Sequence, residues 1–128
     1  MNLIKIKSNA KINLALNVIG KNAKLHKIES LIAFIELHDL IFIKKIKSKN
    51  HRIIFSGKFS KNINSKNTVS KLFEFLDNKK LIHQKYLIKI IKNIPQKSGL
   101  GGGSMNAANI LKYFIKRKII KLSTKQIS

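Results

Sequence analysis

The residues best suited to chemistry form a glycine-rich run, in which four of the five residues from 99 to 103 are glycine. Glycine tolerates positive φ angles and lets the backbone approach a ligand closely. If a helix follows, its first N–H groups and the positive end of its dipole favour a bound phosphate. A flexible turn without a ligand is the alternative. We favour a phosphate site formed by Pro95, Gln96, Lys97, Ser98, Gly99, Leu100, Gly101, Gly102, Gly103 and Ser104.

Two side chains of this run add chemistry to the backbone. Lys97 supplies a positive charge, and Ser104 supplies a hydroxyl for a phosphate oxygen or a magnesium ion. The spacing does not fit a Walker A loop, in which lysine separates the last glycine from Ser or Thr, because Gly103 is followed directly by Ser104. It does not fit the dinucleotide fingerprint either, which requires Gly or Ala at position 104. The run therefore predicts phosphate binding without identifying a reaction.

The elements that position this run change in character along the chain. The first half has alternating or β-branched stretches that predict strands at 4–8, 9–20, 29–36, 39–44 and 52–55. Polar loops are expected at 21–24, 44–51 and 56–66.

The second half has helical periodicity on both sides of one further strand. Apolar residues at helical spacing predict a helix from Asn67 and Thr68, a plausible cap, to residues 77–78. A strand is expected at 86–92, a second helix at 105–115, and the start of a third at 123–126.

Length and composition restrict the class of protein. The 128 residues suffice for one domain, and 44% hydrophobic with 25% charged residues is typical of a globular chain. Lysines interrupt every apolar stretch before the ~20 residues that a membrane span needs. The first seven residues are too charged for a secretory signal, and cysteine is absent, which excludes disulfides. We expect a soluble, cytoplasmic protein.

The net charge of +22 is the unusual feature of the composition. Because only Arg52 and Arg117 are arginines, 25 of the 27 basic residues are lysines, and they are scattered over the whole length. Codon bias in an AT-rich genome and selection for polyanion binding both explain this pattern. Arginine suits bidentate phosphate and base contacts better, so its scarcity favours codon bias. Weak polyanion binding at low salt is expected in either case.

Two motifs together resemble a known family. Residues 8–20 resemble the opening Pro-Ala-Lys-Ile-Asn-Leu strand of the 4-diphosphocytidyl-2-C-methyl-D-erythritol kinases, and residues 94–108 resemble the ATP loop of these GHMP kinases. Homoserine and mevalonate kinases share the glycine loop. The resemblance implies an α+β fold, a mostly antiparallel sheet with helices packed on it, similar to a ribosomal protein domain. It also implies that the γ-phosphate of ATP, with Mg²⁺, is transferred to the 2-hydroxyl of CDP-linked methylerythritol in non-mevalonate isoprenoid synthesis.

The resemblance implies roles for individual residues. It makes Lys11 the catalytic lysine, for which a solvated strand lysine is the alternative, and places His26 and Leu25 at the cytidine, with a surface loop histidine as the alternative for His26. Asn13 follows Lys11 by two residues on the same strand face, where it suits either substrate orientation or a hydrogen bond that caps the strand or lies in the core. Asn67 falls at an adenosine-side position, where helix capping is the alternative role, and Met105 extends the ATP loop.

The sequence departs from the family pattern near the substrate. Ala23, Lys24 and Leu25 replace Asp, Gly and Tyr, so Leu25 offers apolar contact where an aromatic ring would stack on cytosine. Asn9 replaces a proline and Met105 a serine.

The family's catalytic aspartate, in a Gly-x-Asp-Val-Pro segment, is not found before Ser128. None of the acidic residues matches a base position in the family pattern; they are Glu29, Glu36, Asp39, Glu74 and Asp77. We therefore expect residues 1–128 to be an N-terminal ATP-binding domain cut before this aspartate and before a second domain, and inactive alone. Another GHMP kinase and a basic RNA-binding domain are the alternative functions. The glycine run argues against RNA binding, which does not require it.

Overall fold

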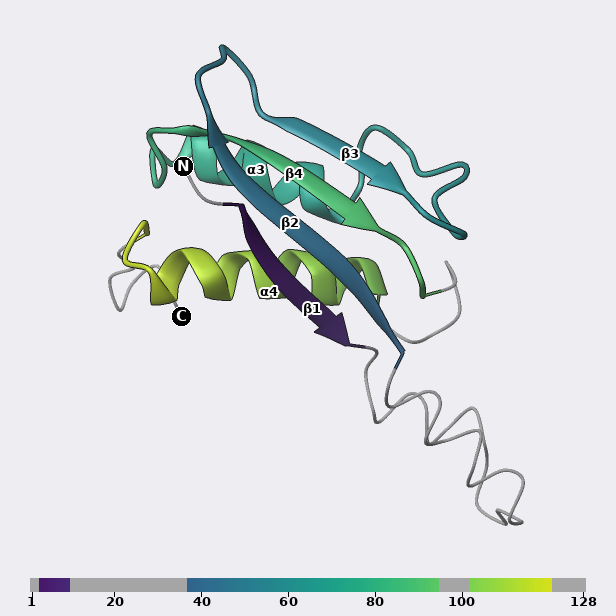
Figure 1. Cartoon of the computed structure of the whole chain (residues 1–128). Coiled ribbons are helices and arrows are strands. Elements are labelled where there is room, and N and C mark those ends of the chain that lie inside the picture. Colours follow the sequence, from purple (N-terminus) through teal and green to yellow (C-terminus); the bar gives the residue numbers. More distant parts are fainter. Residues whose placement is uncertain (1–2, 10–36, 95–101, 121–128) are drawn as a thin grey trace, which may run out of the picture.

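The computed structural model describes residues 3–9, 37–94 and 102–120, and within these ranges four strands form one sheet on which two helices pack (Figure 1). The strands are β1 (Ile4–Asn9), β2 (His38–Ile46), β3 (Arg52–Ser56) and β4 (Lys85–Ile91). The helices are α3 (Thr68–Asn78) and α4 (Gly102–Lys116).

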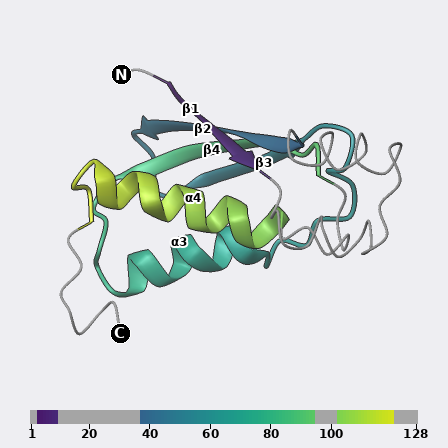
Figure 2. The same ribbon diagram turned by 90° about the horizontal axis from the view of Figure 1, so that it is seen from below.

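The strand order in the sheet differs from the order in the chain. The last described strand, β4, lies between β2 and β3, antiparallel to β2 and parallel to β3, and β1 pairs antiparallel with the other edge of β2. Figure 2 shows both helices on the same face of the sheet. The described part of the chain thus has the predicted α+β architecture, with mostly antiparallel strands and helices packed on them.

Alternation of side chains decides which face of the sheet the helices cover, because successive residues of a strand point to opposite faces. Ile41 and Ile43 of β2 and Ile88 and Ile90 of β4 are all buried at alternate positions. The strands predicted at 4–8, 39–44, 52–55 and 86–92 are confirmed with small shifts at their ends.

The loop predicted over 44–51 was wrong at its start. β2 continues to Ile46 because Lys44, Lys45 and Ile46 pair with Leu87, Tyr86 and Lys85 of β4. Pairing with a central strand overrides the weak strand preference of the two lysines.

The core between sheet and helices is built around Phe114 of α4. Its ring lies 5.8 Å from that of Phe73 in an edge-to-face arrangement and 4.9 Å from that of Tyr86. Leu76 of α3 and Ile110 of α4 complete the same buried cluster. This packing fixes α4 against both α3 and the sheet.

The helix α3 begins as predicted. Asn67 is the N-cap: its Oδ1 accepts a hydrogen bond from the Ser70 N–H at 2.9 Å, and the Ser70 hydroxyl accepts one from the Asn67 N–H at 2.8 Å. This reciprocal capping box satisfies two N–H groups that the helix itself leaves unpaired.

The helix α4 begins earlier than predicted. We expected it at Met105, but it starts at Gly102, so that Gly102, Gly103 and Ser104 form its first turn. The low helix propensity of glycine, about 1 kcal/mol per residue below alanine, suggested a loop. Packing of α4 on α3, β1 and β2 overrides this preference.

The remaining element predictions lie outside the described residues. They are the strand beyond Asn9, the loop at 21–24, the strand at 29–36 and the helix start at 123–126. Within the described ranges, no helix combines the length and apolar character needed to cross a bilayer.

One glycine is required by the backbone itself. Gly57, directly after β3, has a φ of +95°, and a Cβ there would lie 2.9 Å from both the backbone N and the backbone O of Lys92. We predict that Gly57→Ala lowers the free energy of unfolding by about 1–3 kcal/mol, because it adds strain and a clash with backbone atoms. Urea unfolding of the complete protein measures this, and an unchanged midpoint would contradict it.

The far end of the sheet, where β4 begins, is held by a polar cluster around His51. The His51 Nδ1 accepts a hydrogen bond from the Tyr86 N–H at 3.0 Å, so its Nε2 carries the hydrogen and donates to Asp77 Oδ1 at 3.0 Å. Lys85 Nζ lies 3.3 Å from Asp77 Oδ2. Partial burial of the Asp77 carboxyl raises its pKa, but His51 and Lys85 outweigh this and hold the pKa below its usual value.

A lowered pKa makes the contribution of Asp77 to stability depend on pH. The contribution is complete above the unfolded-state pKa of about 3.9 and is lost as the pH falls through the lower folded-state value. We therefore predict that Asp77→Asn is less stable than the parent at pH 7 and that the difference shrinks below about pH 4. Urea unfolding of both proteins at pH 7, 5 and 3 measures the difference, and a pH-independent gap would show that the charge of Asp77 is not responsible.

Candidate functional site

Both sequence motifs leave the sheet at the same end. β1 and β4 end there and β2 begins there, since Ser8 pairs with Asp39, and Ile91 pairs with Leu40. The segment after β1, which begins the first motif, and the glycine run after β4 therefore start from neighbouring strand ends (Figure 1). The order of the strands thus brings the beginnings of two distant segments together.

The first turns of both helices lie at this end as well. A Cβ placed on Gly103 would lie 3.7 Å from Thr68 Oγ1, so the start of α4 adjoins the start of α3. Figure 2 shows the two helices side by side. Neither helix has an acidic residue in its first turn. Two positive helix ends therefore lie together without a carboxylate of their own first turns, which suits an anion.

Four predicted ATP-binding residues, Gly102, Gly103, Ser104 and Met105, lie in the first turns of α4. Gly103 and Ser104 are exposed, and Met105 is half-buried. An α-helix cannot satisfy the N–H groups of its first turn internally, so an exposed start presents them to an external acceptor. The site thus has backbone donors and a serine hydroxyl on a rigid helix.

Asn67 has a structural function in the described fold. Besides accepting from Ser70, its side chain donates from Nδ2 to the Asn64 carbonyl at 2.8 Å, so both amide atoms are engaged at the start of α3. Capping, one of the two roles considered for this residue, is confirmed. Its adenosine-side role stays a prediction, although its helix start adjoins that of α4.

Most of the other predicted site residues lie outside the described ranges. They are Lys11, Asn13, Leu25, His26, Pro95, Gln96, Lys97, Ser98, Gly99, Leu100 and Gly101.

A buried polar cluster that the sequence analysis missed lies at the same end of the sheet. Its centre is Asp39, the second residue of β2, which is 0% exposed. The Asp39 Oδ1 accepts hydrogen bonds from the N–H groups of Asn93, at 2.6 Å, and Ile94, at 2.9 Å. Its Oδ2 accepts from Asn106 Nδ2 of α4, at 3.1 Å, and from the ammonium group of Lys92. We call these five residues the Asp39 cluster.

A second contact reinforces the attachment of α4 to this end of the sheet. Asn109, one turn after Asn106, donates from Nδ2 to the hydroxyl of Ser8 at 3.1 Å. Ser8 is fully buried and lies opposite Asp39 in the β1–β2 ladder. Two asparagines of α4 therefore bind adjacent strands, β2 and β1, at the end where the motifs begin.

The sequence did contain a signal for this cluster. Asp39 occupies the same alternating phase as Ile41 and Ile43, and Lys92 the same phase as Ile88 and Ile90, so both charges fall on the buried face. A charge on the buried phase of a strand needs a buried partner, because an isolated charge there is costly. The phase therefore marks Asp39 and Lys92 as two charges that each need a buried partner, a signal that the sequence analysis did not use.

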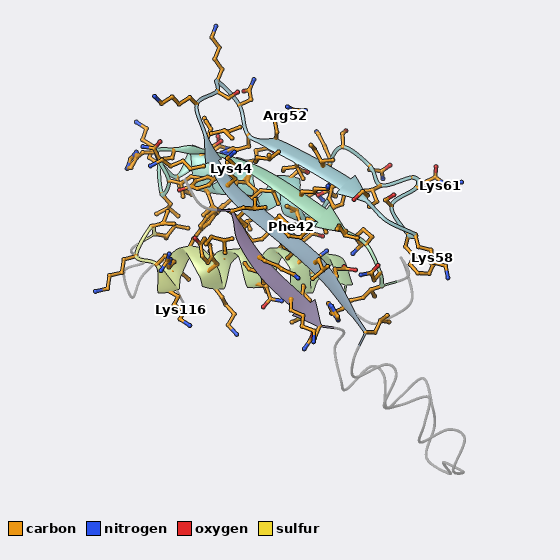
Figure 3. The ribbon with its side chains drawn as sticks, in the orientation of Figure 1. Phe42, Lys44, Arg52, Lys58, Lys61 and Lys116 are labelled. Carbon is orange, nitrogen blue, oxygen red and sulfur yellow. The ribbon has the colours of Figure 1, made fainter. Side chains whose placement is uncertain are left out.

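The described residues do not form an evident metal centre, and their positive charge is dispersed. Within the described ranges, no three His, Asp or Glu side chains gather as metal ligands. Figure 3 shows Lys44 and Arg52 on two strands, Lys58 and Lys61 after β3, and Lys116 at the end of α4, pointing in different directions. Within the described ranges, the feature suited to an anion is therefore the pair of helix starts and not a patch of these lysines.

Comparison with known proteins gives relatives across nearly the whole chain. The family described as GHMP kinases N terminal domain matches residues 67–127. The chain is 63% identical, over 95% of its length, to the 4-diphosphocytidyl-2-C-methyl-D-erythritol kinase of Pelagibacter ubique, of which it covers 44%. It is 37% identical, over 87% of its length, to the enzyme of that name from Clostridioides difficile, of which it covers 38%. The chain thus spans less than half the length of these curated relatives.

A solved structure gives the fold independently. The homoserine kinase from Cytophaga hutchinsonii matches 98% of this chain with a TM-score of 0.62 and 19% identity, over 38% of that protein. At this identity the likeness shows the fold alone. The sequence relatives, the matched domain and the shared fold agree: residues 67–127 match the GHMP kinase N-terminal domain, and nearly the whole chain is similar to 4-diphosphocytidyl-2-C-methyl-D-erythritol kinases.

Proposed function

We propose that the complete protein carrying this chain is a kinase that transfers the γ-phosphate of ATP to the 2-hydroxyl of 4-diphosphocytidyl-2-C-methyl-D-erythritol, a cytoplasmic step of isoprenoid synthesis. The observation that carries the phosphate half of this proposal is the exposed start of α4 beside the start of α3, with no acidic residue in either first turn. The names of the relatives support the choice of acceptor.

The donor half of the site is formed by the glycine run and α4. In this proposal the N–H groups of Gly102, Gly103 and Ser104 bind the phosphates of ATP, and Lys97 adds a positive charge. Met105 lines the same site, and Asn67 stands on the adenosine side. Mg²⁺, which neutralises charge on the phosphate oxygens when it is bound, fits the exposed hydroxyl of Ser104 as one oxygen ligand.

The acceptor half belongs to the segment that follows β1. We assign to Lys11 the stabilisation of charge on the transferred phosphoryl group, and to Asn13, Leu25 and His26 contacts with the cytidine-linked acceptor. The proton of the acceptor hydroxyl goes to an aspartate carried by the remainder of the complete protein. Residues 1–128 in this proposal form the N-terminal ATP-binding part, consistent with the 44% of the Pelagibacter ubique relative that they cover.

The test is a kinase assay of the complete protein with Mg-ATP and separate acceptors. We expect ADP and phosphorylated product with 4-diphosphocytidyl-2-C-methyl-D-erythritol, and neither with homoserine or mevalonate. Phosphorylation of homoserine or mevalonate instead would reject the acceptor while keeping the ATP site. Absence of turnover with any of the three would reject the proposal.

Nucleotide binding is examined separately by NMR. Adding ADP should shift the amide signals of Gly102, Gly103 and Ser104 in the complete protein, because their N–H groups are the proposed phosphate donors. Shifts restricted to lysine side chains on other elements would indicate nonspecific polyanion binding and contradict the assignment.

A further inference from the structure

We infer that Asp39 is a positioning residue of the nucleotide site: its carboxylate fixes the start of α4 relative to the end of β4. The inference rests on the proposed role of the α4 start in binding ATP. It concerns a residue that makes no contact with solvent and matches no catalytic position of the family pattern.

The Asp39 carboxylate accepts hydrogen bonds from residues on both sides of the glycine run in the sequence. Before the run, Oδ1 of Asp39 accepts from the backbone N–H groups of Asn93 and Ile94, the last described residues of that segment. After the run, Oδ2 accepts from Asn106, in the second turn of α4. The same side chain thus binds Asn93 and Ile94, just after β4, and Asn106, in the second turn of α4.

The Lys92 ammonium group explains how the carboxylate remains charged in the core. Lys92 is 4% exposed and bonds the same oxygen that Asn106 bonds. Asp39 therefore has four donors, and the buried pair carries no net charge. Charge-assisted hydrogen bonds are shorter and stronger than neutral ones, so this arrangement suits an anchor better than a neutral amide contact would.

One atom of the cluster remains unpaired. The Asn106 Oδ1 is buried and has no hydrogen-bond partner in the structure described here. An unpaired buried oxygen costs free energy. The bond from Nδ2 to Asp39 offsets this cost and keeps the Asn106 side chain in its orientation. This dependence makes the placement of α4 sensitive to the carboxylate.

Asp39 acts through other residues and is not itself catalytic. Its carboxylate is fully enclosed, so neither ATP nor an acceptor reaches it. Its effect on catalysis passes through the N–H groups of the first turn of α4, whose positions must match the phosphate oxygens closely. We therefore expect loss of Asp39 to weaken nucleotide binding more than turnover.

The experiment compares two double variants of the complete protein, both lacking the buried cation. In Asp39→Asn/Lys92→Met, the asparagine oxygen still accepts from Asn93 and Ile94, and its Nδ2, which replaces Oδ2, donates to Oδ1 of Asn106 when the Asn106 amide is flipped. In Asp39→Ala/Lys92→Met, no acceptor remains. Neither variant leaves a lone buried charge, which would dominate the result.

We expect the alanine variant to differ from the asparagine variant in two measurements. By hydrogen exchange without nucleotide, the Asn93 and Ile94 amides exchange about tenfold faster, the change expected from loss of one hydrogen bond to the carboxyl position. By steady-state kinetics, KM for ATP rises about tenfold, and kcat changes less. Equal exchange rates and equal KM values in the two variants would overturn the inference.

A single variant covers the case in which the alanine double variant does not fold. Asn106→Ala keeps the Asp39–Lys92 pair and both backbone bonds but frees α4. We expect faster exchange at Ala107 and Ala108, which lie past the first turn of α4 and whose N–H groups donate within the helix, and a higher KM for ATP, with Asn93 and Ile94 unchanged. Unchanged exchange at Ala107 and Ala108 with an unchanged KM would overturn the link to α4.

The matched control is the carboxylate at the opposite end of the sheet. Asp77→Ala removes the partner of His51 and Lys85, so it lowers the melting temperature and leaves KM for ATP within about twofold. A KM as high as that of Asp39→Ala/Lys92→Met would show that general destabilisation explains the rise in KM in both proteins. Because the exchange comparison uses no nucleotide, it decides the role of Asp39 even if the complete protein proves not to bind ATP.

Discussion

Replacing Lys11 by alanine in the complete protein lowers kcat by about a thousandfold, or about 4 kcal/mol of transition-state stabilisation. Phosphoryl transfer develops charge on the oxygens of the moving group, and a positioned cation stabilises that charge most in the transition state. The proposed ATP contacts lie elsewhere, on the glycine run and the start of α4. KM for ATP should therefore remain within about twofold of the parent value.

A lysine close to Lys11 in the sequence provides the control for this effect. Lys7 is exposed on β1, four residues before Lys11, and Lys7→Ala removes the same charge from the protein as a whole. We expect its kcat to match the parent. Steady-state kinetics of both variants at saturating ATP measure the difference. Equal rates for the two variants would show that Lys11 is a solvated lysine without a role in catalysis.

Replacing Gly103 by alanine weakens ATP binding by about tenfold or more while leaving the fold as stable as before, or more stable by up to about 1 kcal/mol. Among the described residues, a Cβ at this position meets only Thr68 Oγ1, at the ordinary contact distance of 3.7 Å. Alanine also favours the helix that Gly103 occupies. We therefore propose that glycine serves the close approach of a phosphate to the first turn of α4.

The prediction separates a glycine selected for a ligand from one selected for the fold. The melting temperature and the dissociation constant for ADP of the Gly103→Ala protein measure the two quantities. Ala108→Gly, an exposed position of the same helix, serves as the opposite control and should lower stability without affecting ADP binding. If Gly103→Ala bound ADP as tightly as the parent, the phosphate would not lie at this turn.

Local sequence signals predicted most of the described elements, because strand alternation and helix capping are properties of short segments. Asn67 and the apolar residues that follow it define α3 without reference to the rest of the chain. The start of α4 was predicted three residues late for the opposite reason. Gly102 and Gly103 are poor helix formers, and the packing of α4 as a whole on α3 and the sheet overrides their preference.

The candidate site was predicted in part, for a related reason. The glycine run and its serine were found because they lie together in the sequence. The Asp39 cluster was missed because Asp39 is more than fifty residues from Lys92 in sequence, and no local pattern reports which charges meet across a sheet. The buried phase of each strand identified the two charges individually, but pairing them required the strand order.

The position of β4 in the sheet has a consequence for synthesis of the protein on the ribosome. β2 and β3 leave the ribosome one after the other, yet they are not neighbours in the finished sheet, because β4 inserts between them. Until residue 91 has emerged, the nascent chain therefore presents one edge of β2 and one of β3 without their final partner. Lys44, Lys45 and Arg52 lie on these two strands, and such charges on an open edge discourage pairing with other chains. We expect these three of the 27 basic residues to reduce aggregation of the nascent chain during the interval before β4 emerges.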